Sequence, residues 1–352
     1  MRRYLLFASE LYSLPILRPL AAEIRARGED AAWFVATPLV PYLHADEPRL
    51  VDVHAVRRFS PQAIFSANNW VPHFFPGAKV QLFHGFNVEK RAPERGHFRI
   101  RSLYDLYCTQ GPATTAPFRD LAARLKHFAV VETGWPKLDP LFRDAGPSAL
   151  RPADGRAVVM YAATFTEELS SARALHAGIA RHVARGERYW LLTLHPKTDP
   201  SLVAQYRALE GPNARFLDAT ELVPMMRAAD VLVSDTSSVV SEFIVQGRPV
   251  VTLRNRAPKP HMIDIADPAR LDAALDQAFA PSAALRDAIA EYSARIHPMR
   301  DGRSSARVLD ATAALLDGAL GTLAPKPMNL WRKLQGRMRY ARWRRLDGAD
   351  PD

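Results

Sequence analysis

The chain has 352 residues, enough for two domains of ordinary size, and its 48% hydrophobic and 24% charged residues exclude a largely disordered, collagen-like or coiled-coil protein. Its single cysteine, Cys108, excludes an intramolecular disulfide and indicates a reducing, cytoplasmic compartment. The formal net charge is +10, and residues 325–352 carry eight Lys or Arg against three Asp, so this basic tail favours an anionic surface, either lipid head groups or nucleic acid.

The opening apolar run is broken at Ser9 and Glu10, so we expect a first strand rather than a signal peptide or a membrane-spanning helix, which needs ~20 apolar residues. Short apolar or β-branched runs then alternate with helical patterns, which is typical of βαβ units and a parallel sheet. We therefore expect an α/β fold. In the first half the pattern predicts a helix over 16–27 and strands over 4–8, 32–36, 63–66, 80–83 and 105–109.

A domain boundary is expected within residues 144–155, where DAGPSALRPADG concentrates Pro, Gly, Asp and Ser without periodicity. We expect a first domain over 1–148, a second over 149–322 and a basic helical tail over 323–352. In the second domain the alternation predicts strands over 157–165, 189–194, 231–234 and 249–253. It also predicts helices over 201–209, 221–228, 238–246, 271–279, 283–296 and 304–316.

The most informative segment, SDTSSVVSEF, follows the strand at 231–234, where Asp235, Ser237 and Ser238 lead into a helix. Hydroxyl groups and open backbone N–H groups at a helix start favour a phosphate. Glu242 lies one helical turn beyond Ser238, where its carboxylate suits a pair of ribose hydroxyls. The structural alternative is that Asp235 and the serines only cap the helix.

Two further segments have anion-binding character. His195 and Lys197 follow a strand and so belong at the carboxyl edge of the sheet, where open α/β sheets bind ligands. We expect both to meet a diphosphate. Near the end, Asp301 precedes Arg303 and Ser304 at another helix start. The alternative is that Arg303 is a solvated surface charge.

In the first half, His84 and Gly85 follow the strand at 80–83, and Lys90 comes shortly after. Histidine is the usual general base near neutral pH, and glycine permits a close approach of the backbone to a substrate. The alternative is a structural role, which is the commoner one for a lone histidine at a strand end.

Taken together, these segments resemble the CDP-glycerol glycerophosphotransferase family of teichoic-acid and capsule polymerases. The resemblance spans roughly residues 80–310, and its motifs occur in the family's order. They are the His84-Gly85 pair with Lys90, GWPKLD from Gly134, YAATFT from Tyr161, TLHP from Thr193, SDTSSVVSEF from Ser234 and DGRSSAR from Asp301. The chain departs from the family's residues at Ala163, Thr166, Thr236 and Lys197, which leaves the identity of the donor open.

The resemblance implies a GT-B fold, in which two Rossmann-like domains face a cleft, with the acceptor on the first domain and the nucleotide donor on the second. It implies that His84 is the base for an acceptor hydroxyl and that His195 also takes part in catalysis. It places Gly85 and Lys90 on the acceptor side and assigns the nucleotide and its diphosphate to His195, Ser237, Ser238, Glu242 and Arg303. From their positions at strand ends and helix starts, we also expect Lys197, Asp235 and Ser304 to bind the donor or its phosphates. No cofactor and no metal are expected, since the only D-x-D lies at Asp350 to Asp352, outside any predicted strand.

The reaction implied by the resemblance moves glycerol phosphate, or a related unit, from a CDP-activated donor to a glycan or lipid-linked acceptor and releases CMP. The enzymatic alternative is a GT-B glycosyltransferase or an epimerase that uses a nucleotide sugar, because similar diphosphate sites recur in this architecture. The non-enzymatic alternative is a basic nucleic-acid-binding protein, but the sequence contains no recognised nucleic-acid module, so we expect no nucleic-acid partner.

The tail has two alternative roles. Its apolar residues fall on one side of a helix that is flanked by arginines, and this pattern is typical of a helix in an anionic membrane interface. These residues are Leu330, Trp331, Leu334, Met338 and Ala341. We therefore expect a peripheral protein on the cytoplasmic face of the cell membrane. In the alternative, the helix packs back onto the first domain.

Overall fold

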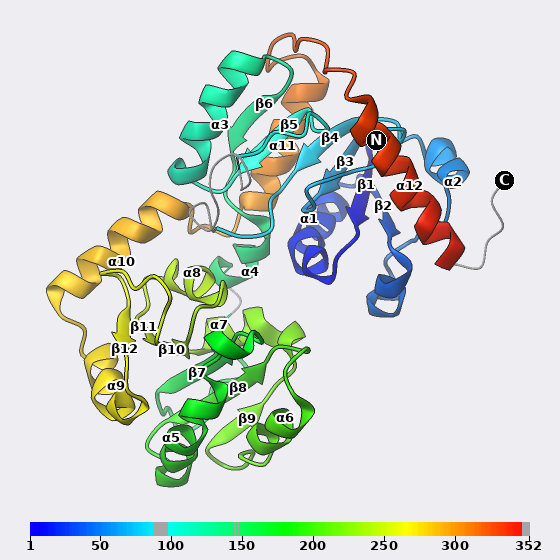
Figure 1. Cartoon of the computed structure of the whole chain (residues 1–352). Helices are drawn as coiled ribbons and strands as arrows, with labels where there is room; N and C mark the ends of the chain where they lie inside the picture. The colour runs from blue at the N-terminus through cyan, green and yellow to red at the C-terminus, as the bar shows by residue number, and fades with distance from the viewer. Residues whose placement is uncertain (87–97, 144–145, 147, 347–352) are drawn as a thin grey trace. The chain divides into compact units, whose positions relative to one another are not determined.

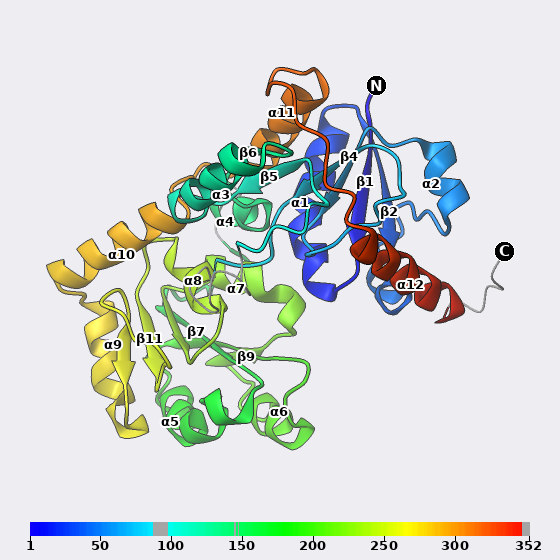
Figure 2. The ribbon, with the colours of Figure 1, turned by 45° about the horizontal axis from the view of Figure 1, so that its top comes forward.

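The computed structural model describes residues 1–86, 98–143, 146 and 148–346 of the chain. The chain divides into two units, which we describe separately. Unit 1 comprises Met1–Pro140 and Met299–Asp352, and unit 2 comprises Leu141–Pro298. Each unit is built on a six-stranded sheet with helices around it (Figures 1 and 2), so the expected α/β class is confirmed.

All strand pairs of the unit 1 sheet are parallel, and the strand order is β2-β1-β3-β4-β5-β6. The strands are β1 (Arg3–Ala8), β2 (Asp30–Val35), β3 (Ala63–Ser66), β4 (Ala78–Gln81), β5 (Leu106–Thr109) and β6 (Ala129–Glu132). The chain runs from β1 to β2 at one edge and returns to β3 on the other side of β1. This reversal between β1 and β3 is the place where open sheets of this kind bind ligands, outside the carboxyl ends of the strands.

The helices of unit 1 are α1 (Leu14–Ala26), α2 (Val53–Phe59), α3 (Pro112–Leu125), α11 (Ser304–Leu316) and α12 (Leu330–Leu346), and the short α4 (Asp139–Phe142) leads into unit 2. Aromatic side chains dominate one core, in which Phe7, Phe34, Phe75, Phe83 and Phe118 are all buried. Strands buried on both faces need such continuous apolar runs, which explains why the sequence pattern identified them.

The unit 2 sheet has the order β12-β11-β10-β7-β8-β9 and is also parallel throughout. Its strands are β7 (Val158–Ala163), β8 (Tyr189–Leu194), β9 (Ala214–Phe216), β10 (Val231–Ser234), β11 (Val250–Leu253) and β12 (Ile263–Ile265). Its helices are α5 (Ala172–Arg185), α6 (Pro200–Arg207), α7 (Leu222–Ala228), α8 (Val239–Ile244), α9 (Leu271–Phe279) and α10 (Ala283–Ile296). Here the strand order reverses between β7 and β10.

The structure differs from the expected extent of the second domain, because residues 299–322 lie in unit 1. Helix α11 packs against α1 and β5. Two ion pairs tie the same segment to the start of the chain, Arg27 with Asp310 (2.6 Å) and Arg2 with Asp317 (2.7 Å). A helix of this kind buries its apolar face against whichever sheet it meets, and a sequence pattern does not say which sheet that is.

Helix α12 also packs on unit 1, and both views show it beside β2 (Figures 1 and 2). Tyr340 contacts the aromatic core, with its ring 5.4 Å from that of Phe74, 6.1 Å from that of Phe34 and 6.3 Å from that of Phe75. At its start, Asn329 donates to the carbonyl of Arg101 across 2.8 Å. The tail therefore does fold back onto the first unit.

Candidate functional site

In unit 1, His84 lies just beyond the carboxyl end of β4. Phe83, which precedes it, has a φ of +58°, a conformation that is costly for a bulky residue and is typical of functional turns. The buried Phe83 ring, 5.1 Å from that of Phe118, anchors this turn in the core, so the exposed His84 projects from a fixed point.

The Nδ1 atom of His84 lies 3.1 Å from the backbone carbonyl of Ala67. A carbonyl only accepts, so Nδ1 carries the proton in the neutral ring and Nε2 has the lone pair of a base. The pKa of His84 is lowered, first by loss of hydration and also by the charge of Arg101, while the Ala67 carbonyl opposes the shift. The ring is therefore neutral at pH 7, as a general base requires.

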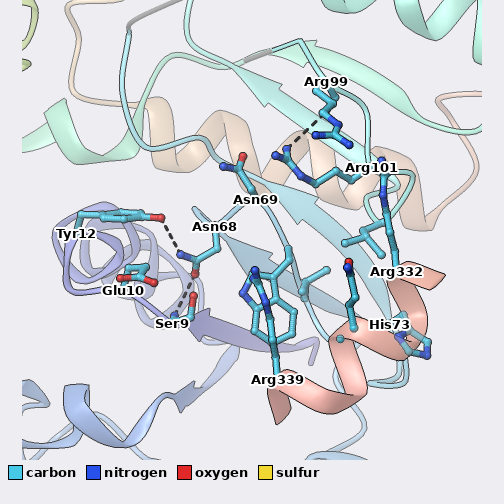
Figure 3. Close-up of a pocket in the computed structure, with 15 residues that line it drawn as sticks. Ser9, Glu10, Tyr12, Asn68, Asn69, His73, Arg99, Arg101, Arg332 and Arg339 are labelled. Carbon is cyan, nitrogen blue, oxygen red and sulfur yellow. Dashed lines mark hydrogen bonds between the residues drawn. The ribbon is translucent and has the colours of Figure 1, made fainter. Parts of the chain in front are cut away.

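Tyr12 links His84 to a polar network at the reversal point between β1 and β3. Its ring centroid is 5.0 Å from that of His84, and its hydroxyl accepts a 3.1 Å hydrogen bond from the side-chain amide of Asn68. The side-chain oxygen of Asn68 in turn accepts from the backbone N–H of Ser9 at 3.1 Å (Figure 3). Asn68 thus joins the segments that follow β1 and β3.

Gly85 and Lys90 are the other two residues predicted on the acceptor side. Among the residues that the structure describes, a Cβ on Gly85 would meet no atom within 4 Å, so these surroundings leave room for a substrate, and the role of Gly85 stays a prediction. Lys90 lies outside the described residues.

In unit 2, His195 follows β8, and Phe165 follows β7. Their ring centroids are 4.3 Å apart, and the Lys197 ammonium lies 5.5 Å from the Phe165 centroid. The backbone N–H of Lys197 donates to Nδ1 of His195 across 3.1 Å, so in the neutral ring the proton is on Nε2. Burial and the Lys197 charge lower the pKa of His195. His195 therefore presents an N–H donor, and Lys197 presents a cation.

Asp235 makes several hydrogen bonds within unit 2, and its predicted contact with a phosphate stays a prediction. Its fully buried carboxylate accepts from the backbone N–H groups of Thr164 (3.0 Å) and Ser171 (2.9 Å) and from the Ser171 hydroxyl (3.0 Å). Desolvation raises its pKa, and these hydrogen bonds oppose the shift. Asp235 therefore fixes the connection from β7 to α5 and is a positioning residue.

The hydroxyl residues after β10 are only partly used by the fold. The Ser237 hydroxyl accepts from the N–H of Val239 at 3.4 Å, which is a weak capping contact. Ser238 is exposed, and its side chain makes no capping bond to α8. Glu242 is buried one turn later, with 4% of its surface exposed. The structure thus brings His195, Lys197, Ser237 and Ser238 to the carboxyl edge of one sheet, and their binding roles stay predictions.

Arg303 and Ser304 belong to unit 1, so they do not share a unit with the other predicted donor residues. The start of α11 is already occupied by a carboxylate, since the N–H groups of Ser304 and Ser305 each donate to Asp139 across 2.8 Å. Arg303 is exposed. Asp139 of the GWPKLD motif thus accepts from the N–H groups expected to meet a phosphate, and the binding roles of Arg303 and Ser304 stay predictions.

Sequence reasoning missed several residues of these surroundings. Phe165 belongs to the YAATFT motif, but nothing in the sequence places it against His195. Tyr12 and Asn68 follow strands, and that position was the signal available for finding them. Within the described ranges, no group of three or more His, Cys, Asp or Glu side chains is arranged to hold a metal ion, and no helix is long and apolar enough to cross a bilayer.

Comparison with known proteins gives both a family and a fold. The model of the CDP-glycerol:poly(glycerophosphate) glycerophosphotransferase family matches residues 77–255, which include His84, His195 and Ser238. The wall teichoic acid polymerase TagF, in a structure soaked with CDPG, is similar with a TM-score of 0.67 and 14% identity over 91% of this chain and 90% of that chain.

Two other solved structures are similar. They are a UDP-N-acetylglucosamine 2-epimerase, so described, from Listeria monocytogenes (TM-score 0.65, 12% identity, 90% of this chain and 96% of that chain) and S. aureus MnaA with UDP (0.62, 12%, 93% and 100%). No curated protein matches the sequence. Together with TagF, these likenesses confirm the expected GT-B fold.

Proposed function

Because the chain belongs to the CDP-glycerol:poly(glycerophosphate) glycerophosphotransferase family, we propose that it transfers glycerol phosphate, or a related unit, from a CDP-activated donor to an acceptor hydroxyl and releases CMP. The acceptor in this proposal is a cell-surface glycan or its lipid-linked precursor. The observation that carries the proposal is the hydrogen bond from His84 to the carbonyl of Ala67, which leaves Nε2 as a base at the end of β4.

In the proposed reaction the acceptor hydroxyl loses its proton to Nε2 of His84 while its oxygen attacks the distal phosphorus of the donor. The bond from that phosphorus to the CMP oxygen breaks, CMP leaves with the electron pair, and His84 later returns the proton to solvent. General-base assistance of this kind contributes ~10²- to 10⁴-fold to a rate. CMP is a good leaving group, so the reaction has little need of a strong acid.

The donor in this proposal is held by unit 2. The Nε2–H of His195 donates to a phosphate oxygen, and the nearby Lys197 ammonium offsets the negative charge that develops on the departing CMP. The exposed Ser238 hydroxyl adds a neutral donor, and Glu242 accepts from the ribose. Lys197 is well suited to this role because Phe165 covers its ammonium on one side and so restricts its position.

We also propose a peripheral location on the cytoplasmic face of the membrane. Helix α12 uses Tyr340 to contact the unit 1 core and leaves large apolar side chains exposed elsewhere on its surface. These are Leu330 (67% exposed), Trp331 (66%), Leu334 (49%) and Met338 (51%). Such side chains among basic residues suit an anionic lipid surface, where a lipid-linked acceptor would also be found.

The experiment that tests the activity compares donors on the full chain. Thermal melts with CDP-glycerol, CMP, UDP and a UDP-sugar report which ligand binds the folded state, since ~100 Kd of a ligand adds about 2.7 kcal/mol of stability. We expect the cytidine compounds to raise the Tm most, with CMP released when an acceptor is added. Selective stabilisation by the uridine compounds would favour a nucleotide-sugar enzyme, the alternative suggested by the fold's likeness to the epimerase and to MnaA.

A further inference from the structure

A second feature of unit 1 lies beside Tyr12, where a cavity of about 520 Å³ opens at the reversal point of the sheet (Figure 3). Ser9, Glu10 and Tyr12 enter it from the segment after β1, and Asn68 to Val71 enter it from the segment after β3. Helix α12 forms another wall with Arg332, Gln335, Gly336 and Arg339. The cavity therefore occupies the position where parallel sheets bind ligands, and the basic tail helps to enclose it.

The lining of this cavity is strongly basic. Its residues include four arginines, Arg99, Arg101, Arg332 and Arg339, against a single carboxylate, that of Glu10. In the part of the chain that the structure describes, none of the four arginines forms an ion pair with a carboxylate. Burial and the neighbouring charges of Arg99 and Arg332 lower the pKa of Arg101, which shows that like charges are held together here. Such an arrangement favours a multivalent anion.

The fold holds these guanidinium groups in place and leaves N–H donors to spare. Arg332 donates to the carbonyl of Ile100 at 3.3 Å, and Arg101 donates to the carbonyl of Arg99 at 3.5 Å. The guanidinium of Arg339 lies 5.4 Å from the ring centroid of Trp70. Each guanidinium has several N–H groups arranged in a plane, and one carbonyl uses only one of them. The remaining donors match the oxygens of a phosphate.

We propose that this cavity binds a phosphate or diphosphate group of the acceptor, and that α12 is required because it supplies Arg332 and Arg339. The inference rests on the proposed function, in that His84, which neighbours Tyr12, is then the base for a hydroxyl of the same acceptor molecule. The phosphate has two possible sources, a lipid-linked diphosphate or a soluble phosphorylated glycan. The exposed apolar residues Trp331 and Leu334 lie on the same helix as the cavity arginines, where they suit the hydrocarbon part of a lipid-linked group.

Calorimetric titration of the full-length protein with inorganic pyrophosphate tests the site. Arg101→Gln and Arg332→Gln should each weaken binding about tenfold or more, as expected for the loss of a charged hydrogen-bonding partner. Arg337→Gln is the matched control, because it removes the same charge from α12 at a residue that lies over Phe74 and outside the cavity. Equal weakening by Arg337→Gln would mean that the net charge, and not this site, determines binding, and would overturn the proposal. Unchanged binding in both cavity variants would also overturn it.

A second control separates this site from the donor site. Lys197→Gln in unit 2 should leave most pyrophosphate binding intact, and both cavity variants should still bind CDP-glycerol. Loss of pyrophosphate binding in Lys197→Gln alone would overturn the proposal. If CDP-glycerol fails to bind any form of the protein while pyrophosphate still depends on Arg101 and Arg332, the proposed donor is wrong but the anion site stands.

Geranyl diphosphate distinguishes the two sources of the phosphate. A lipid-linked acceptor is supported if geranyl diphosphate binds at least about tenfold more tightly than pyrophosphate, because each buried CH₂ favours association. This gain in affinity should be lost in the double variant Trp331→Ser with Leu334→Ser. Equal affinity for the two probes supports a soluble phosphorylated acceptor. In both cases binding depends on Arg332, and independence from Arg332 would contradict the assignment of the cavity.

Discussion

The backbone N–H of Lys197 donates a 3.1 Å hydrogen bond to Nδ1 of His195. His84 has the opposite arrangement, since its Nδ1 faces the carbonyl of Ala67 at 3.1 Å. In the neutral state His195 therefore carries its proton on Nε2, and His84 carries its proton on Nδ1. The same side chain is thus set up as a hydrogen-bond donor in unit 2 and as a base in unit 1, through one backbone contact in each.

Replacement of His84 tests its role as the base. We expect His84→Ala to lower kcat by ~10²- to 10⁴-fold, with CMP affinity unchanged within about twofold, because no base then takes the acceptor proton. The measurements are transfer kinetics, CMP calorimetry and a thermal melt of the same preparation. If the Tm of His84→Ala falls together with its activity, the ring has a structural role in the turn after Phe83.

The pH dependence of transfer follows from the lowered pKa of His84. The neutral ring is the active form, so kcat/KM, which reports the free enzyme, falls as the pH drops through this pKa, and the acid limb should lie below the ordinary histidine value of ~6.5. Arg101 contributes to the lowering, so Arg101→Gln should move the limb to higher pH. An acid limb of the kcat/KM profile at the same pH in Arg101→Gln would contradict this coupling.

On the donor side, Ser238→Ala combined with Glu242→Gln should weaken CMP binding by about tenfold or more, because each hydrogen bond to a charged group contributes roughly 1.5 to 3 kcal/mol. Glutamine keeps the shape of the buried Glu242 side chain, so a melt of the double variant checks that the unit remains folded. If the double variant binds CMP with wild-type affinity in a calorimetric titration, both residues have only a capping or packing role.

Asp139 joins two separate sequence motifs, and its loss should destabilise unit 1. Asp139→Asn weakens the contacts to the N–H groups of Ser304 and Ser305, and we expect a cost of about 1 to 3 kcal/mol in the free energy of unfolding by urea. Asp310→Asn is the control, because its ion pair with Arg27 is at the surface, where such pairs contribute ~0 to 1 kcal/mol. Equal costs for the two variants would contradict the capping role of Asp139.

Helix α12 has two faces, an exposed one with Trp331 and Leu334 and one that packs on the core through Tyr340. Trp331→Ser with Leu334→Ser should reduce sedimentation with anionic liposomes without lowering the Tm, because both side chains are exposed. Tyr340→Ala should lower the Tm, because its ring packs against Phe34 and Phe74. Vesicles of phosphatidylcholine alone provide the uncharged control. Unchanged sedimentation of the double variant would exclude this face as the membrane contact.

The sequence pattern identified the central strands of both sheets but missed three strands at sheet edges. These are β6, β9 and β12, each of which lies at an edge of its sheet and pairs with a single neighbouring strand. The four residues of β6 are all only half-buried, and β9 and β12 have three residues each, so their sequences lack a long apolar run. The strand expected over 80–83 ends at Gln81, because Phe83 turns into the left-handed region.

The candidate site was predictable where it depends on strand ends. His84 follows a strand of the unit 1 sheet, and His195 and Ser238 follow strands of the unit 2 sheet. The topology of each parallel sheet brings such positions to its own carboxyl edge. The arginine cavity was not predictable, since Arg101 and Arg332 are more than 200 positions apart and meet only because α12 returns to unit 1. The two histidine tautomers depend on backbone geometry that no residue pattern encodes.

The return of the chain to unit 1 also affects the order in which the protein can fold during synthesis. Residues 1–140 leave the ribosome without α11 and α12, so Asp139 has no partner at Ser304 and Ser305, and the core lacks Tyr340. Unit 2 is continuous in sequence and has all its strands once residue 298 has emerged. The second unit is therefore the first to be complete on the ribosome, and the unit that carries His84 is finished last.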